Sequence, residues 1–222
     1  MTKRRKWTVL PGFLALAAAA TVLSAYSGAS SSQGREPEQP IAFPHPTHVQ
    51  KLGMNCLYCH FSANKSPDPG MPAVGTCVGC HSIIGPDRPA SELGPKRTSA
   101  ELQKLWKYAD IKAVMSPAGP AARPIPWVRI HKVPDYVQFP HMRHVTAGVT
   151  CQTCHGQIQN MARVYQASSL NMGWCVGCHV NGYNLADGAR AAGAPDSVIR
   201  AAEALGERGV RKARYDCAVC HY

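Results

Sequence analysis

The sequence predicts a mainly α-helical fold with much irregular structure, made of short helices and loops. Three observations predict it. The 222 residues include 18 prolines and only 7% aromatic residues, so the apolar core is thin for this length. The pattern Cys-x-x-Cys-His occurs five times, and the pair His-x-x-His occurs twice, each time before two of these five patterns. An apolar run near the N-terminus predicts one longer helix.

The pattern Cys-x-x-Cys-His is typical of covalent haem attachment. Two thiols three positions apart can form thioether bonds with the two vinyl groups of one haem, and the histidine that follows can ligate the iron. The cysteines are Cys56, Cys59, Cys77, Cys80, Cys151, Cys154, Cys175, Cys178, Cys217 and Cys220, and the histidines are His60, His81, His155, His179 and His221. These motifs use all ten cysteines of the chain. We therefore expect five covalently bound haem c groups, around which the short helices and loops are wrapped.

Zinc binding and dithiol redox chemistry are the other common uses of paired cysteines. A zinc site needs cysteine or histidine sets that close a tetrahedron, and a thioredoxin-like motif occurs once, near a βαβ pattern. Repetition of the motif with the histidine always in the same place disfavours both.

Five histidines remain outside the motifs, and they match the number of distal ligands that five haems need. They are His45, His48, His131, His141 and His144. We therefore expect every iron to have two imidazole ligands and no open position. The fifth motif lies at the end of the sequence, so we expect its distal ligand from upstream, with His131 as the predicted residue. Met161 and Met172 compete for this role, because methionine also takes axial positions on haem iron.

The N-terminal residues 1–26 read as a membrane anchor or an uncleaved signal sequence. Lys3, Arg4, Arg5 and Lys6 precede an apolar run of about 20 residues, which is the length that spans a bilayer. We favour a retained transmembrane helix with the basic cluster inside and the remainder on the periplasmic, extracytoplasmic side. Cleavage at the small residues Ser27, Gly28 and Ala29 is the alternative. Residues 27–40 are rich in Ser, Gly, Pro and charge, and we expect a linker there.

The rest of the chain contains an internal repeat. FPHPTHV begins at Phe43 and FPHMRHV begins at Phe139, 96 residues later. We expect a first haem module with its connector over residues 41–138, which holds two haems, and a second module over residues 139–222, which holds three. If each His-x-x-His pair lies on a helical turn, its two side chains share a face. Two haems bound by such a pair are then close neighbours that exchange electrons quickly.

Four segments between the motifs have recognisable local patterns. Thr98 to Tyr108 predicts a packing helix, with Thr98 and Glu101 at capping-box spacing. Residues 116–126 are too rich in proline for a helix or a central strand, so an extended connector is expected. Residues 127–140 predict a short strand or an extended arm laid over a haem. Asp196 to Leu205 predicts a helix that ends near Gly206.

The formal net charge is +11, which raises the question of nucleic-acid binding. Four of the positive charges lie in the N-terminal cluster, and no nucleic-acid motif is visible. Haem propionates or an acidic redox partner are the expected counterparts of the basic side chains. We therefore expect no nucleic-acid partner.

The motifs together resemble the pentahaem cytochrome c subunit (ActA) of bacterial alternative complex III. The resemblance covers most of residues 41–222, and its most specific part is WVRIHKVPDYVQFPH beside two Cys-x-x-Cys-His motifs. It does not extend to residues 187–214. The resemblance implies a non-enzymatic electron-transfer subunit that relays electrons from quinol oxidation towards a soluble periplasmic acceptor. It also implies iron–sulfur and integral membrane subunits and a further cytochrome c as partners.

Two other functions share many of these motifs. A free or peripheral periplasmic multihaem carrier that serves a terminal reductase has the same motifs without fixed membrane partners. A multihaem enzyme, such as a nitrite or hydroxylamine-type redox enzyme, needs one haem with an open position. The equal numbers of distal histidines and motifs argue against the enzyme.

Overall fold

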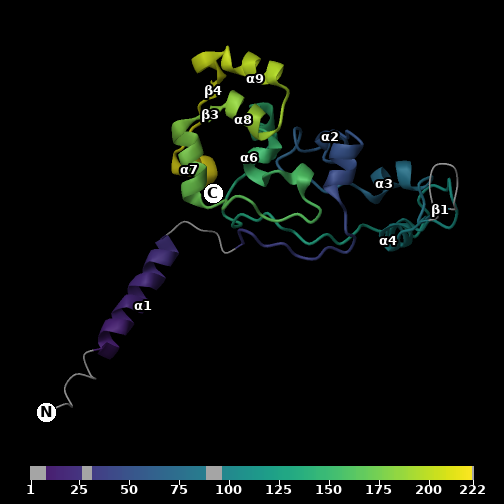
Figure 1. Cartoon of the computed structure of the whole chain (residues 1–222), viewed down its shortest axis with the longest axis horizontal. Coiled ribbons are helices and arrows are strands. Elements are labelled where there is room, and N and C mark those ends of the chain that lie inside the picture. Colours follow the sequence, from purple (N-terminus) through teal and green to yellow (C-terminus); the bar gives the residue numbers. More distant parts are fainter. Residues whose placement is uncertain (1–8, 27–31, 89–96, 222) are drawn as a thin grey trace.

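The computed structural model describes residues 9–26, 32–88 and 97–221, and it is built from short helices joined by long irregular segments (Figure 1). The helices are α1 (Val9–Tyr26), η1 (Pro46–Lys51), α2 (Cys56–Cys59), α3 (Val74–His81), α4 (Ala100–Ala109), α5 (His141–Thr146), α6 (Cys151–His155), η2 (Ile158–Asn160), α7 (Met172–Asn181), α8 (Leu185–Ala191), α9 (Asp196–Glu203), η3 (Gly206–Gly209) and α10 (Cys217–Cys220). Two antiparallel pairs of short strands complete the fold, β1 (Asp87–Arg88) with β2 (Arg97–Thr98) and β3 (Tyr183–Asn184) with β4 (Val210–Arg211). The predicted mainly helical and irregular fold is therefore confirmed.

Helix α1 stands away from the remainder of the described chain in Figure 1. The side chains of residues 11–22 are exposed. Across residues 9–26, 32–88 and 97–221, none of the helices combines the length and the apolar character that crossing a bilayer takes. The transmembrane helix predicted from the sequence is thus not confirmed. The basic cluster at residues 3–6 and the small residues 27–29 lie outside the described residues.

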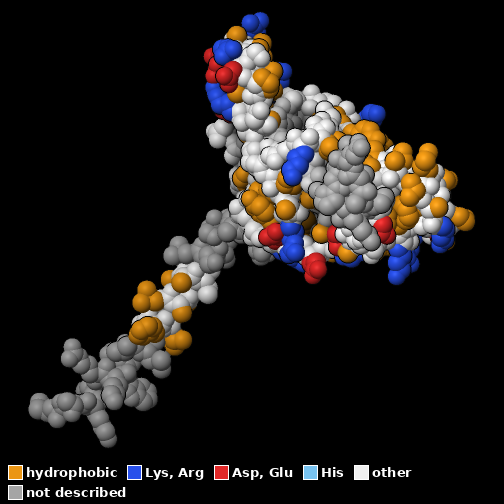
Figure 2. Space-filling view, turned by 45° about the vertical axis from the view of Figure 1, so that its right-hand side comes forward, with side chains coloured by type: hydrophobic (Ala, Val, Ile, Leu, Met, Phe, Trp, Pro, Cys, Tyr) orange, Lys and Arg blue, Asp and Glu red, His pale blue; other side chains and the backbone are white. Residues whose placement is uncertain are grey.

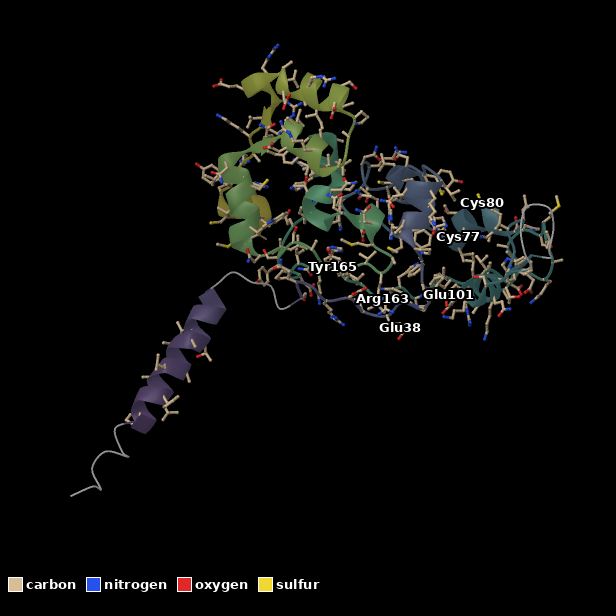
Figure 3. All side chains as sticks on the ribbon, viewed as in Figure 1. Glu38, Cys77, Cys80, Glu101, Arg163 and Tyr165 are labelled. Carbon is tan, nitrogen blue, oxygen red and sulfur yellow. The ribbon has the colours of Figure 1, made fainter. Side chains whose placement is uncertain are left out.

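The described part of the predicted linker, residues 32–40, is held against the second half of the chain. Gly34 N donates to Gln166 O at 2.8 Å, and Gln166 N donates to Arg35 O at 3.3 Å. The Gln39 side chain forms two hydrogen bonds with the backbone of Val128, at 2.9 and 3.0 Å. Figure 3 shows Glu38, Arg163 and Tyr165 along the same edge of the molecule. This segment is therefore part of the fold and does not behave as a free tether.

The packing helix predicted from residue 98 to residue 108 is confirmed as α4, although its cap is Ser99 and not Thr98. The Ser99 hydroxyl accepts a hydrogen bond from Leu102 N at 3.3 Å, which satisfies one of the free amides at the helix start. Leu105 is buried in a cluster with Ile41 and Ile125. On the same helix, the Trp106 indole donates to His81 O at 2.8 Å. Helix α4 thus supports α3, which carries the second Cys-x-x-Cys-His motif.

The C-terminal part of the chain adds a small lobe made of α8, α9 and the β3–β4 pair. The predicted helix from Asp196 is confirmed as α9, which ends two residues earlier than expected, at Glu203. The Tyr183 hydroxyl accepts a hydrogen bond from Thr150 N at 3.1 Å, so the lobe is tied to the start of α6. A Cβ atom on Gly188 would lie 1.7 Å from this hydroxyl, which is why only glycine fits there. Acidic and basic side chains gather on this lobe, at the top of Figure 2.

The extended connector predicted over residues 116–126 is confirmed, because the segment contains neither helix nor strand. Residues 127–140 form an extended arm and no regular strand. The one bridge found in this arm joins Val137 to His221. The arm therefore reaches the last Cys-x-x-Cys-His motif of the chain.

Truncation of Leu105 tests the importance of this small core. Leu105→Ala removes a buried side chain of the Ile41 and Ile125 cluster, and we expect a loss of about 2–4 kcal/mol in the free energy of unfolding. Chemical denaturation of the haem-loaded protein measures it. Lys107→Ala, on the exposed side of the same helix, is the control and should change stability by less than about 0.5 kcal/mol. Equal effects of the two variants would contradict a structural role for this cluster.

Candidate haem-attachment sites

Each Cys-x-x-Cys-His motif lies on a helical turn. The motifs occupy α2, the C-terminal part of α3, α6, the middle of α7, and α10. Residues three apart on a helix share one face, so both thiols of a motif point to the same side. The Asn55 and Asn171 side chains cap α2 and α7 by accepting hydrogen bonds from Leu57 N and Trp174 N. All ten cysteines are free thiols, which leaves every one available for a thioether bond.

The first three motifs are neighbours in space. The thiols of Cys56 and Cys151 are hydrogen-bonded to each other, which lowers the pKa of Cys56 and raises that of Cys151. Burial raises the pKa of Cys77, and the nearby Cys59 thiol adds to the shift. The first motif therefore lies between the second and the third.

The last three motifs continue this row. Burial raises the pKa of Cys154 to about 11, and the nearby Cys178 thiol adds to the shift. Burial also raises the pKa of Cys175, and the nearby Cys220 thiol adds to the shift. The spatial order of the helices is thus α3, α2, α6, α7 and α10, and Figure 1 shows the first four in this order. Figure 3 shows Cys77 and Cys80 at one end of this row.

The two His-x-x-His pairs have the same local geometry, as expected from the sequence repeat. His45 directly precedes η1 and His48 lies within it, while His141 and His144 both lie in α5, so each pair is on a helical turn. Phe43 stacks on His48 at a centroid distance of 4.3 Å, and Phe139 stacks on His144 at 4.4 Å. The repeated phenylalanine thus orients the second histidine of each pair.

Three histidine pairs have the separation that one shared iron requires. Metal–imidazole bonds are about 2 Å long in zinc sites, so two imidazoles on opposite sides of one metal have ring centroids about 6 Å apart. The observed centroid distances are 6.1 Å for His48 and His81, 6.1 Å for His144 and His179, and 6.4 Å for His141 and His155. In each pair, one histidine belongs to a His-x-x-His turn and the other belongs to a Cys-x-x-Cys-His motif. The three pairs use three different motifs.

His45 is the remaining member of the two His-x-x-His pairs, and it lies near His60. Burial lowers the pKa of His45 to about 4, and His60 is the next cause of that shift. The Nδ1 atom of His45 is buried and has no hydrogen-bond partner in the described part of the chain. By analogy with the second repeat, we expect His45 and His60 to form the fourth pair.

Backbone carbonyls determine which ring nitrogen of most of these histidines is available to a metal. His48 Nδ1 lies 3.1 Å from Pro44 O, and His144 Nδ1 lies 3.1 Å from Pro140 O. The Nδ1 atoms of His81 and His141 contact Ile84 O at 3.1 Å and Pro67 O at 3.3 Å in the same way. Because an Nδ1–H that donates to a carbonyl leaves Nε2 unprotonated, Nε2 is the nitrogen that is free to bind a metal.

Burial also favours the protonation state that binds metals. It lowers the pKa of His155 to about 3, and the neighbouring His131 and His141 add to the shift. Burial likewise lowers the pKa of His144. Neutral imidazole is the form that ligates iron.

His131 lies beside the third motif, and this position differs from the one predicted from the sequence. His131 Nε2 is 3.2 Å from His155 Nδ1, with a ring centroid distance of 4.2 Å. The stacking partner of His221, the histidine of the fifth motif, is Tyr136 at a centroid distance of 5.7 Å. The predicted pairing of His131 with the fifth motif is therefore not what the structure shows.

The two methionines considered as alternative ligands have different environments. Met161 is buried, and its methyl group packs close to Gly156, directly after the third motif. Met172 is 70% exposed at the start of α7. Met161 is therefore a packing residue next to the third motif.

Several contacts of the site were missed at the sequence level. The carbonyl of Pro67 receives both the backbone N–H and the ring Nδ1 of His141, so the loop after the first motif holds the second repeat. Tyr136 was likewise not recognised as the neighbour of His221. The contacts of Phe43 and Phe139 with the histidines could have been predicted, because both repeats have phenylalanine at the same distance before their histidines.

The surroundings of the motifs fit a large apolar cofactor. Large hydrophobic side chains within or near the motifs are exposed, namely Tyr58, Phe61, Ile83, Ile84, Val180 and Tyr215. Hydrophobic side chains are visible over much of the surface in Figure 2. Paired thiols, paired imidazoles and adjacent apolar surface together match the needs of haem c. Within the described ranges, no cluster of three or more His, Cys, Asp or Glu is arranged to hold a bare metal ion.

Comparison with known proteins agrees with this chemistry. Residues 137–222 match the family described as cytochrome c7 and related cytochrome c, which implies covalently bound haem c. The chain is also 27% identical over 165 residues to the multihaem cytochrome c subunit of a menaquinone reductase from Nitratidesulfovibrio vulgaris, which covers 65% of this chain and 69% of that protein. Residues 137–222 therefore form a cytochrome c7-like multihaem domain, and the activity that both similarities support is electron transfer by a multihaem cytochrome c.

Proposed function

We propose that this chain is a pentahaem electron-transfer subunit of a membrane quinol oxidoreductase of the alternative complex III type. The observation that carries the proposal is the similarity to a cytochrome subunit of a menaquinone reductase, in a chain whose five motifs form one spatial row. In this proposal, electrons pass from quinol oxidation towards a periplasmic acceptor. Each haem supplies reversible one-electron transfer.

The residues of the chain hold the cofactors and limit their chemistry. The paired cysteines fix each haem to a helical turn, so neighbouring attachment sites stay in a constant order from α3 to α10. The four histidine pairs would each supply two imidazoles to one iron when haem is bound, which would leave those irons without room for a substrate. An iron closed in this way would exchange electrons without binding a reactant, which supports a relay role for the chain.

The partners follow from this role. Quinol chemistry requires membrane-embedded subunits, and we propose integral membrane and iron–sulfur subunits, together with a further cytochrome c, as neighbours of this chain. Covalent haem attachment in bacteria is extracytoplasmic, which supports a periplasmic location of residues 32–221. The basic and apolar composition of the first 26 residues supports export.

Electron flow in the opposite direction is the second candidate function. The relative from Nitratidesulfovibrio vulgaris is called a menaquinone reductase, which indicates electron delivery to quinone in that protein. The same row of attachment sites serves either direction, since one-electron transfer between haems is reversible.

Purification from membranes tests the proposed complex. We expect the native protein, extracted in mild detergent, to comigrate with large integral membrane and iron–sulfur subunits identified by mass spectrometry. Haem staining locates the chain in the gel. Recovery of the chain alone in the soluble fraction would replace the proposal by a free periplasmic carrier.

The direction of electron flow is measured on the same preparation. Menaquinol added to the oxidised complex should reduce the haems within the time of turnover, as followed by their visible absorption. A complex that instead oxidises its reduced haems only when menaquinone is supplied would favour the second candidate function.

Removal of one attachment site tests the number of haems. Cys77→Ala combined with Cys80→Ala should lower the covalently bound haem content from five to four per chain, because α3 then has no thiol. Intact mass under denaturing conditions gives the count. A wild-type count other than five would contradict the proposed use of every motif.

Removal of a distal histidine tests the proposed pairs. His144→Ala should convert one haem to the high-spin state, because His179 then ligates its iron alone, and electron paramagnetic resonance of the oxidised protein detects this. Arg143→Ala, an exposed neighbour on α5, is the control and should keep the spin-state spectrum of the wild type. A wild-type spectrum in both variants would remove His144 from the set of ligands.

A further inference from the structure

The contact between His131 and His155 differs from the other contacts made by the histidines of the site. His155 Nδ1 faces an imidazole nitrogen, His131 Nε2, at 3.2 Å. The Nδ1 atoms of His48, His81 and His144 face backbone carbonyls instead. Among the motif histidines of the described residues, His81 and His179 have Nδ1 next to backbone carbonyls, whereas Nδ1 of His155 faces another side chain.

The geometry shows that His131 is not a second ligand of the third iron. Two nitrogens bound to opposite sides of one metal are about 4 Å apart, because each bond is about 2 Å long. The 3.2 Å contact is a hydrogen-bond distance, and it uses Nδ1 of His155 while Nε2 stays available. His141 lies at a centroid distance of 6.4 Å from His155, with the two rings at 19°, so His141 is the residue that would share an iron with His155.

The arm that carries His131 is held at both of its ends. The Gln39 side chain forms two hydrogen bonds with the backbone of Val128, which holds the start of the arm. Further along, Gln138 N donates to Cys220 O at 2.7 Å, and Val137 bridges His221. With both ends held, the position of His131 beside His155 follows from the path of the arm.

We propose that His131 is a positioning residue that accepts a hydrogen bond from His155 Nδ1–H, and that it does not ligate the fifth iron. The inference rests on the proposed attachment of haem to the third motif. A hydrogen-bond acceptor on the far nitrogen orients a ligating imidazole and makes it more basic, which stabilises the oxidised metal. His131 thus lowers the midpoint potential of the third haem.

The test compares His131→Ala and His131→Gln with the wild type in the full haem-loaded chain. We expect both variants to keep the wild-type content of covalent haem and to gain no high-spin signal. In His131→Ala the midpoint potential of one haem shifts upwards, because His155 has lost its acceptor. Glutamine offers an amide oxygen in a similar place, so His131→Gln should recover part of the wild-type potential. If the alanine variant does not accumulate, the glutamine variant carries the spectroscopic comparison by itself.

Two results would overturn the assignment. A new high-spin signal of one haem, removed by added imidazole, would make His131 an iron ligand, and His144→Ala provides the reference spectrum for such a loss. Unchanged midpoint potentials of all haems would show that the contact with His155 has no effect. A wild-type protein without haem on the third motif is a different failure, which refutes the proposed function and is recognised by mass before any potential is measured.

Discussion

The approach of imidazoles from distant segments is the interaction on which the rest of the structure depends. His144 and His179 are 35 residues apart, and His48 and His81 are 33 apart, yet both pairs have ring centroids 6.1 Å apart. Holding two rings at this distance requires rigid helical turns on both sides. It also requires one ring nitrogen committed to the protein, which the backbone carbonyls of Pro44, Pro140 and Ile84 supply.

This constraint explains why the chain has so little conventional core. The buried hydrophobic residues form small clusters around Leu105 and Val78, while Tyr58, Phe61 and Ile83 near the motifs are exposed. Long irregular segments connect helical turns that are distant in sequence. The arm from Trp127 to Pro140, for example, contacts both His155 and His221. Cofactors that bind only the folded chain stabilise it in proportion to their affinity, so a thin core is compatible with a stable protein.

Local patterns in the sequence predicted much of the fold. Helices α4 and α9 lie where the amphipathic pattern predicted them, and both His-x-x-His pairs lie on helical turns, as their spacing allowed. The helical turns at the motif cysteines were not predicted. The position of His131 could not be predicted, because a count of ligands says nothing about which residue faces which iron. The same limit applies to Pro67 and Tyr136, whose roles depend on how the two halves of the chain pack. The cap of α4 was misplaced by one residue because Thr98 and Ser99 are both good capping residues.

An experimental structure of the haem-loaded protein tests the central claim most directly. Our account predicts that Nε2 atoms of His48 and His81 share one iron, and that His144 and His179 share another. It also predicts that the attachment sites follow one another in the order α3, α2, α6, α7 and α10. An iron held by two histidines of the same His-x-x-His turn, or a branched arrangement in which α2 is not between α3 and α6, would contradict it.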